Sequence, residues 1–151
     1  MIVFKNNPSI DMSQDKILDC IQHFKNSGKD FVIGQRNAIK IFEVEGQILN
    51  IKSFRVPNFI NRIIYRYFRK TKAARSFEYA TILMNKGIGT PKPIAFYECF
   101  NLLGLKESYY VCEHINADLT YRELVQTDYP DGENILRQFT RFSFEMHQKA
   151  I

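Results

Sequence analysis

The stretch Gly46–Lys86, GQILNIKSFRVPNFINRIIYRYFRKTKAARSFEYATILMNK, contains the two elements that decide the fold. Residues 48–54, ILNIKSF, predict a strand in which alternate side chains face opposite ways, so that Lys52 shares a face with Ile48, Asn50 and Phe54. Residues 71–86 predict a helix whose small, apolar stripe includes the carboxylate of Glu78. A charge on an apolar stripe is costly unless it is paired, so we expect Lys52 and Glu78 to meet if the helix packs on the sheet. The alternative is a snorkelling lysine and a solvated glutamate.

The segments on either side predict an α+β domain with an antiparallel sheet. Residues 29–54 read as a meander of three strands, with a turn at Gly34–Asn37 and a tight turn at Glu45–Gly46. After the helix, residues 94–113 predict a second hairpin that turns at Leu103–Gly104. Three antiparallel strands, a helix and a hairpin differ from the alternation of strands and helices that builds a parallel sheet.

The two ends of the chain predict further elements. Residues 1–28 form an N-terminal extension, with a short strand over 1–5 and a helix over 12–26 that ends at Ser27–Gly28. Residues 133–150 predict a final amphipathic helix. Neither end shows a motif with chemistry of its own.

Composition and charge set only broad limits on function. The 151 residues suffice for one domain with a real core, and a net charge of +5 with a pI of about 9.1 indicates an anionic partner. The three cysteines show no C-x-x-C spacing, which favours reduced thiols in the cytosol over a zinc site or a disulfide framework. The sequence has neither a secretory signal nor a membrane-spanning window, so we expect a cytoplasmic protein.

A dense cluster of basic residues lies between the strand and the helix. In NRIIYRYFRKTKAARS, residues 61–76, Arg62, Arg66 and either Arg69 or Lys70 are spaced to share one face of a helix. A solvated helix face is the simplest interpretation. The more specific alternative is an anionic-surface patch that binds lipid headgroups at the inner membrane or a phosphorylated glycan. Nucleic acid is disfavoured, because no nucleic-acid-binding module is visible.

Several stretches occur in the same order as the predicted elements: GQRNAIKIF, ILNIKSFRVPNFINRIIYRYFRKTKAARSFEYA, NKGIGTPKPIAF, KESYYVCEHI and FSFEMH. Together they resemble the lipopolysaccharide kinase family, the Kdo kinase/WaaP/InaA group, which has a protein-kinase-like fold. The resemblance spans Gly28 to Ile151 and implies a kinase-like N-lobe over 29–113. That lobe is a five-stranded antiparallel sheet plus helix C, and the hinge and the first helices of a C-lobe follow over 114–151.

The same resemblance implies the residues of an ATP site. Lys52 corresponds to the lysine that contacts the nucleotide phosphates, and Glu78 to its partner on the helix. The backbone of Glu113 and Ile115 is implied to bind adenine at the hinge, where Cys112 takes the gatekeeper position. The resemblance also implies that the nucleotide pocket is lined by Ile33, Ile39 and Val111. From the residues alone, this hinge strand is equally a plain core strand.

Two departures from the family pattern affect the expected activity. Gly34 stands alone, without the G-x-G-x-x-G spacing of a phosphate-binding loop. In the family, an aspartate base and metal-binding asparagine and aspartate residues follow the helix that here ends near His147, and this chain stops at Ile151. We therefore expect a fragment of a longer kinase that is inactive alone, with ATP and Mg²⁺ as the cofactors implied by the resemblance.

The sequence leaves two functional hypotheses open. The first is the ATP-binding lobe of a kinase that phosphorylates a sugar of the lipopolysaccharide core, either Kdo or heptose. The second is a non-catalytic kinase-like module whose basic helix contacts anionic lipid or a partner protein. If the chain is a truncated kinase, we expect self-association through residues 133–151, because without a C-lobe the apolar face with Phe139, Phe142 and Met146 is exposed.

Overall fold

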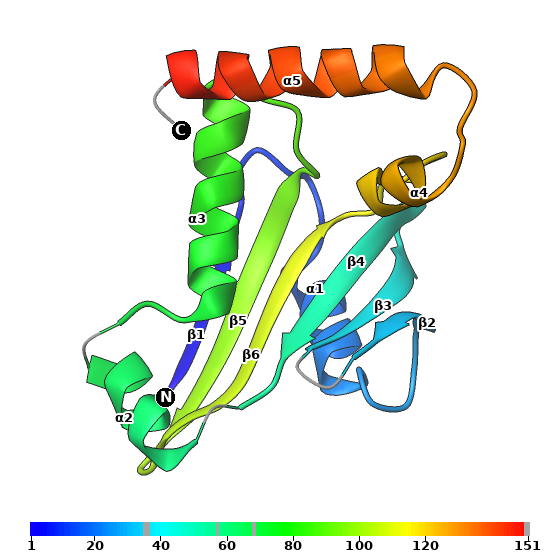
Figure 1. Cartoon of the computed structure of the whole chain (residues 1–151). Coiled ribbons are helices and arrows are strands. Elements are labelled where there is room, and N and C mark those ends of the chain that lie inside the picture. Colours follow the sequence, from blue (N-terminus) through cyan, green and yellow to red (C-terminus); the bar gives the residue numbers. More distant parts are fainter. Residues whose placement is uncertain (35–36, 57, 68, 150–151) are drawn as a thin grey trace. The chain divides into compact units, whose positions relative to one another are not determined.

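The computed structural model describes residues 1–34, 37–56, 58–67 and 69–149, and Figure 1 shows the course of the chain. The chain forms two compact units, Met1–His114 and Ile115–Ile151. We call the first the sheet unit and the second the helical unit, and each is described by itself.

The sheet unit contains an antiparallel sheet that has six strands within the described residues. The α+β class predicted from the sequence is therefore confirmed. The five strands predicted over 29–113 are present, and the N-terminal strand, predicted as part of a separate extension, pairs with β5 and makes the sheet six-stranded. From one edge to the other the strands are β1 (Ile2–Asn6), β5 (Pro93–Asn101), β6 (Gly104–Glu113), β4 (Gln47–Phe54), β3 (Asn37–Val44) and β2 (Lys29–Ile33).

The turns of the predicted meander follow from residues that tolerate a left-handed backbone. Glu45 and Gly46 join β3 to β4 with φ values of 54° and 76°, as a two-residue hairpin turn requires. Gly28, just before β2, has a φ of 79°, and a Cβ built there would lie 2.6 Å from the Phe42 ring. Only glycine therefore fits both the backbone and the space at position 28.

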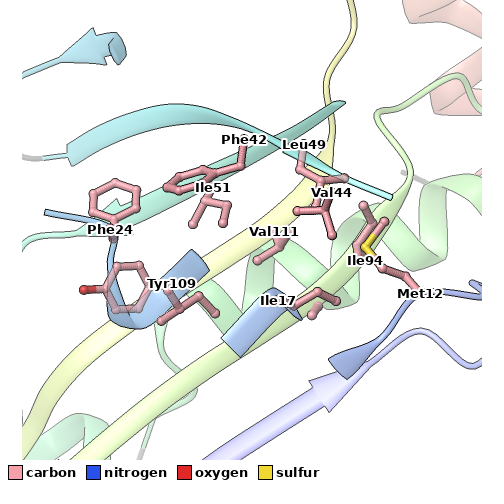
Figure 2. Close-up of a cluster of buried hydrophobic side chains, with 12 residues drawn as sticks. Met12, Ile17, Phe24, Phe42, Val44, Leu49, Ile51, Ile94, Tyr109 and Val111 are labelled. Atoms are coloured by element: carbon pink, nitrogen blue, oxygen red, sulfur yellow. The ribbon is translucent and has the colours of Figure 1, made fainter. Parts of the chain in front are cut away.

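One face of the sheet is covered by α1 (Gln14–Gln22) and holds the larger hydrophobic cluster, shown in Figure 2. Leu49 and Ile51 of β4 and Val111 of β6 are completely buried in it. Because alternate residues of a strand point to opposite faces, the burial of Leu49 and Ile51 directs Lys52 to the other face. The N-terminal segment thus supplies one layer of the core.

The opposite face is covered in part by α3 (Lys72–Asn85), which lies along β5 and β6 (Figure 1). Phe77 of α3 packs there against Phe54 and Phe96, and the Phe77 and Phe96 rings meet edge on at 5.5 Å. The helix predicted over 71–86 is confirmed, with Gly87 at its C-terminal end in the left-handed conformation (φ 67°). The shorter α2 (Phe59–Tyr67) precedes α3 and contacts β6.

A buried polar contact fixes the N-terminal end of α3. The hydroxyl of Thr71 accepts a hydrogen bond from the backbone N–H of Ala74 at 3.2 Å and donates one to the carboxylate of Glu98 on β5. Thr71 and Glu98 are both buried. Burial raises the pKa of Glu98, and the hydrogen bond from Thr71 partly offsets that rise.

The helical unit contains α4 (Tyr121–Gln126) and α5 (Gly132–Gln148). A capping box between Thr120 and Glu123 begins α4. The final helix predicted from the sequence is confirmed, and none of the α5 residues that the structure describes is buried. Across the described part of the chain, no helix is long and apolar enough to cross a lipid bilayer.

Candidate functional site

Lys52 lies on the face of the sheet that α3 partly covers. In β4 it is opposite Ile39 of β3 and Tyr110 of β6, and its Nζ atom is 5.3 Å from the centroid of the Phe54 ring. The side chain is half-buried. Among the described residues no carboxylate is within ion-pair distance of this ammonium group, although ion pairs form elsewhere in the chain.

Glu78 does not pair with Lys52, so this part of the sequence prediction is wrong. Its two carboxylate oxygens accept hydrogen bonds from Nζ of Lys70 at 2.7 and 2.8 Å. Glu78 lines a cavity of about 410 Å³ together with Lys5 of β1 and Phe96 of β5. β6 lies between β5 and β4. The part of β5 that lines this cavity is therefore about 10 Å from β4, the strand that carries Lys52, at the usual strand spacing.

Cys112 lies close enough to Lys52 for the two groups to interact electrostatically. Cys112 is buried in β6, opposite Asn50 of β4. Burial raises the pKa of its thiol to about 11, while a hydrogen bond with Tyr110 and the positive charge of Lys52 act in the opposite direction. The structure therefore brings Lys52, Ile39 and Cys112 together, and leaves Cys112 as a neutral thiol at physiological pH.

The end of β6, predicted to be a hinge, is fixed by backbone hydrogen bonds. The N–H of Glu113 donates to the carbonyl of Lys92 at 3.0 Å, and that of His114 donates to the carbonyl of Ile48 at 2.9 Å. The N–H of Glu113 is therefore already used within the protein. Ile115, the other predicted adenine-binding residue, is half exposed and begins the helical unit.

His114, directly after β6, makes specific contacts with two other strands. Its Nδ1 atom is 3.1 Å from Oδ1 of Asn50, and its ring meets the Phe31 ring edge on at 5.4 Å. The only sequence signal for this contact was Asn50, a polar residue on the same face of β4 as Lys52. The imidazole thereby joins β2, β4 and the end of β6.

No family model, no curated protein and no solved structure matches this chain. Its function is therefore inferred from its own side chains and their geometry. The described residues contain no group of three or more His, Cys, Asp and Glu side chains that could hold a metal ion. No Mg²⁺ ligand is therefore assigned.

The basic segment, residues 61–76, lies partly in α2 and partly in the chain after that helix. Arg69 and Lys70 lie after this helix and not on its face, which corrects the predicted i, i+4, i+7 stripe. Lys70 is occupied by Glu78, whereas Arg69 lines a separate cavity near α2. The side chains of Arg62 and Arg66, and that of Ile33 in the predicted nucleotide pocket, lie outside the described part of the structure.

Proposed function

We propose that the sheet unit binds ATP on the face that carries Lys52, as the nucleotide-binding lobe of a cytoplasmic kinase that acts on a sugar hydroxyl of the lipopolysaccharide core. The observation that supports ATP binding is the state of Lys52, a half-buried ammonium group without a carboxylate partner among the described residues. A half-buried cation without a counter-ion favours the binding of an anion such as a triphosphate.

The surroundings of Lys52 suit the base of a nucleotide. On the same face of the sheet, Ile48 of β4 is 46% exposed, although it stands beside fully buried residues of the same strand. Phe31 of β2 is 54% exposed and contacts His114. Apolar and aromatic side chains in this position offer a stacking surface for a purine ring.

The lysine of β4 would hold the phosphates of ATP, and the apolar residues would hold the base. The transfer of a phosphoryl group to a sugar is suggested by the family resemblance of the segments around Lys52. In kinases the lysine of the third strand positions the phosphates, and separate groups supply the base and the metal ligands. No step involving Mg²⁺ is derived for this chain.

Titration of the full chain with ATP in a calorimeter tests this proposal. We expect Lys52→Ala to weaken ATP binding at least about tenfold, because a charge-assisted hydrogen bond to phosphate is lost. Lys5→Ala is the matched control, since Lys5 is also a strand lysine whose Nζ atom lies over a phenylalanine ring, 5.8 Å from the centroid of Phe77. We expect this control to change the affinity by less than about twofold.

Two outcomes would contradict the proposal. If the parent protein binds no ATP, the sheet unit is not a nucleotide-binding lobe. If Lys52→Ala and the parent bind ATP with equal affinity, Lys52 does not contact the phosphates. Circular dichroism of each variant establishes that the fold is kept, so that a lost affinity reports the site and not unfolding.

We also propose that the chain self-associates through the apolar stripe of α5. Phe139 and Phe142 on this stripe are 48% and 37% exposed. We expect the mass measured by light scattering to rise with protein concentration, and the double variant Phe139→Ser/Phe142→Ser to remain monomeric. Phe144→Ser on the same helix is the control and should still associate, because residue 144 is off the stripe. A monomeric parent at every concentration would refute this proposal.

A further inference from the structure

A cavity of about 640 Å³ lies next to α2, at the end of the sheet where β4 finishes and α3 begins. Residues from the end of β4, from α2, from the segment that leads into α3 and from β6 line it. Its polar lining residues include Arg55, Asn61, Tyr65, Arg69, Lys72 and Ser108. Among the described residues, none of the groups predicted to bind ATP lines this cavity, although Phe54, whose ring centroid is 5.3 Å from Nζ of Lys52, does.

The cavity is strongly positive. Arg55, Arg69 and Lys72 contribute three cationic side chains, and none of the lining residues that the structure describes is acidic. None of the three forms an ion pair with another described residue, in contrast to Lys70, which is paired with Glu78. Cations that share a cavity repel one another unless an anion is bound between them.

A buried hydroxyl in the same cavity has no hydrogen-bond partner among the residues that the structure describes. Ser108 of β6 is 3% exposed, and its Oγ atom is buried without a hydrogen bond in the described part of the chain. Leaving a buried hydroxyl unsatisfied is unfavourable, and such groups in native proteins call for an explanation. An oxyanion in the cavity would accept the proton of Ser108 and complete this bond.

The neighbouring polar groups are compatible with an anion. Lys72 is the first residue of α3, so the positive end of that helix lies at the cavity wall. Glu98, opposite Ser108 in the pairing of β5 with β6, is the nearest carboxyl in register. Its hydrogen bond from Thr71 directs it to the cap of α3.

We propose that this cavity binds the phosphate group of a phosphorylated ligand, with Arg55, Arg69 and Lys72 neutralising its charge and Ser108 donating a hydrogen bond. The three cations come from the end of β4, from the segment after α2 and from the start of α3. The phosphate belongs either to a soluble phosphate ester or to a phospholipid headgroup. This inference goes beyond the proposed ATP site and does not depend on it.

Calorimetric titration of the full chain with inorganic phosphate and with pyrophosphate, at constant ionic strength, tests this proposal. We expect Arg55→Gln/Lys72→Gln to weaken binding at least about tenfold, because two charge-assisted contacts are lost. The charge-matched control Lys25→Gln/Arg122→Gln removes two exposed cations from outside the cavity and should bind as the parent does.

Ser108→Ala provides a measurement that does not depend on charge. Because the hydroxyl has no partner among the described residues, its removal should leave the melting temperature unchanged or raise it, while phosphate binding weakens about threefold to tenfold. A serine with a purely structural role would instead lower the melting temperature and leave binding unchanged. That result would remove Ser108 from the site.

Sedimentation with phosphatidylcholine vesicles, with and without phosphatidic acid, distinguishes the two sources of phosphate. Binding of free phosphate or pyrophosphate that the Arg55→Gln/Lys72→Gln variant loses indicates a soluble ester. Binding only to vesicles that contain phosphatidic acid, again lost in this variant, indicates a lipid headgroup.

Absence of binding in both measurements, or an equal loss in the charge-matched control, would overturn the proposal. Lys52→Ala should bind phosphate normally, so failure of the ATP proposal is recognised separately.

Discussion

Leu49→Ala is expected to destabilise the sheet unit by about 3–4 kcal/mol, within the range measured for large-to-small substitutions in protein cores. Leu49 is completely buried in the cluster between α1 and the sheet. The substitution removes buried methyl groups and leaves a cavity that the central strand β4 cannot easily close, since strands lie on both of its sides. A loss of this size is a large part of the stability of an ordinary domain.

Urea denaturation followed by circular dichroism and tyrosine fluorescence measures this effect. Ile48→Ala is the control, because Ile48 is the adjacent residue on the opposite face and is 46% exposed. It should cost less than about 1 kcal/mol. If the two substitutions cost the same, the assignment of alternate β4 residues to a buried and an open face is wrong.

Thr71→Val should be the second most damaging of these substitutions, at about 2–4 kcal/mol, because it removes two hydrogen bonds and keeps the shape of the side chain. The N–H of Ala74 loses its cap, and the buried carboxyl of Glu98 loses its donor. Thr81→Val on the same helix is the control. Its hydroxyl only donates to the carbonyl of Phe77, so the loss there should stay below about 1 kcal/mol.

The cost of Thr71→Val should depend on pH. Burial raises the pKa of Glu98 in the folded state, so the folded protein holds this proton more tightly than the unfolded chain does. The contribution of Glu98 to stability is therefore present at acid pH and is lost as the pH rises through the folded-state pKa. In Thr71→Val the hydrogen bond that lowers the pKa of Glu98 is missing, so this loss of stability at higher pH is greater than in the parent. The difference in unfolding free energy between parent and variant should thus be larger at neutral than at acid pH, and a pH-independent difference would contradict the role given to Glu98.

The local pattern of the sequence predicted most of the strands and helices of the sheet unit. Alternation over β4, the Glu45–Gly46 turn and the glycine after α3 are short-range signals, and each depends on a few neighbouring residues. The helix predicted over 12–26 was too long, and α1 ends at Gln22. The backbone N–H groups of Asn26 and Ser27 bond to the carbonyl of His23 in the turns that lead to Gly28.

The candidate sites were harder to predict, because they depend on how distant segments are placed. The spacing of Glu78 identified an apolar stripe on α3, but the side of the helix that faces β4 depends on its packing, and Lys70 lies closer. The phosphate cavity joins Arg55, Lys72 and Ser108 from three segments, and no local pattern marks them as neighbours. Ser108 in particular appears in the sequence as an ordinary residue of a strand.

The pairing of β1 with β5 has a consequence for synthesis of the protein. Ile2 lies opposite Cys99, so a chain made from its N-terminus has completed β1 long before the partner strand exists. Until then β1 exposes backbone groups that could pair with another nascent chain. The edge at β1 therefore stays open until β5 has been made, and the sheet is complete only when β6, which joins β5 to β4, has followed.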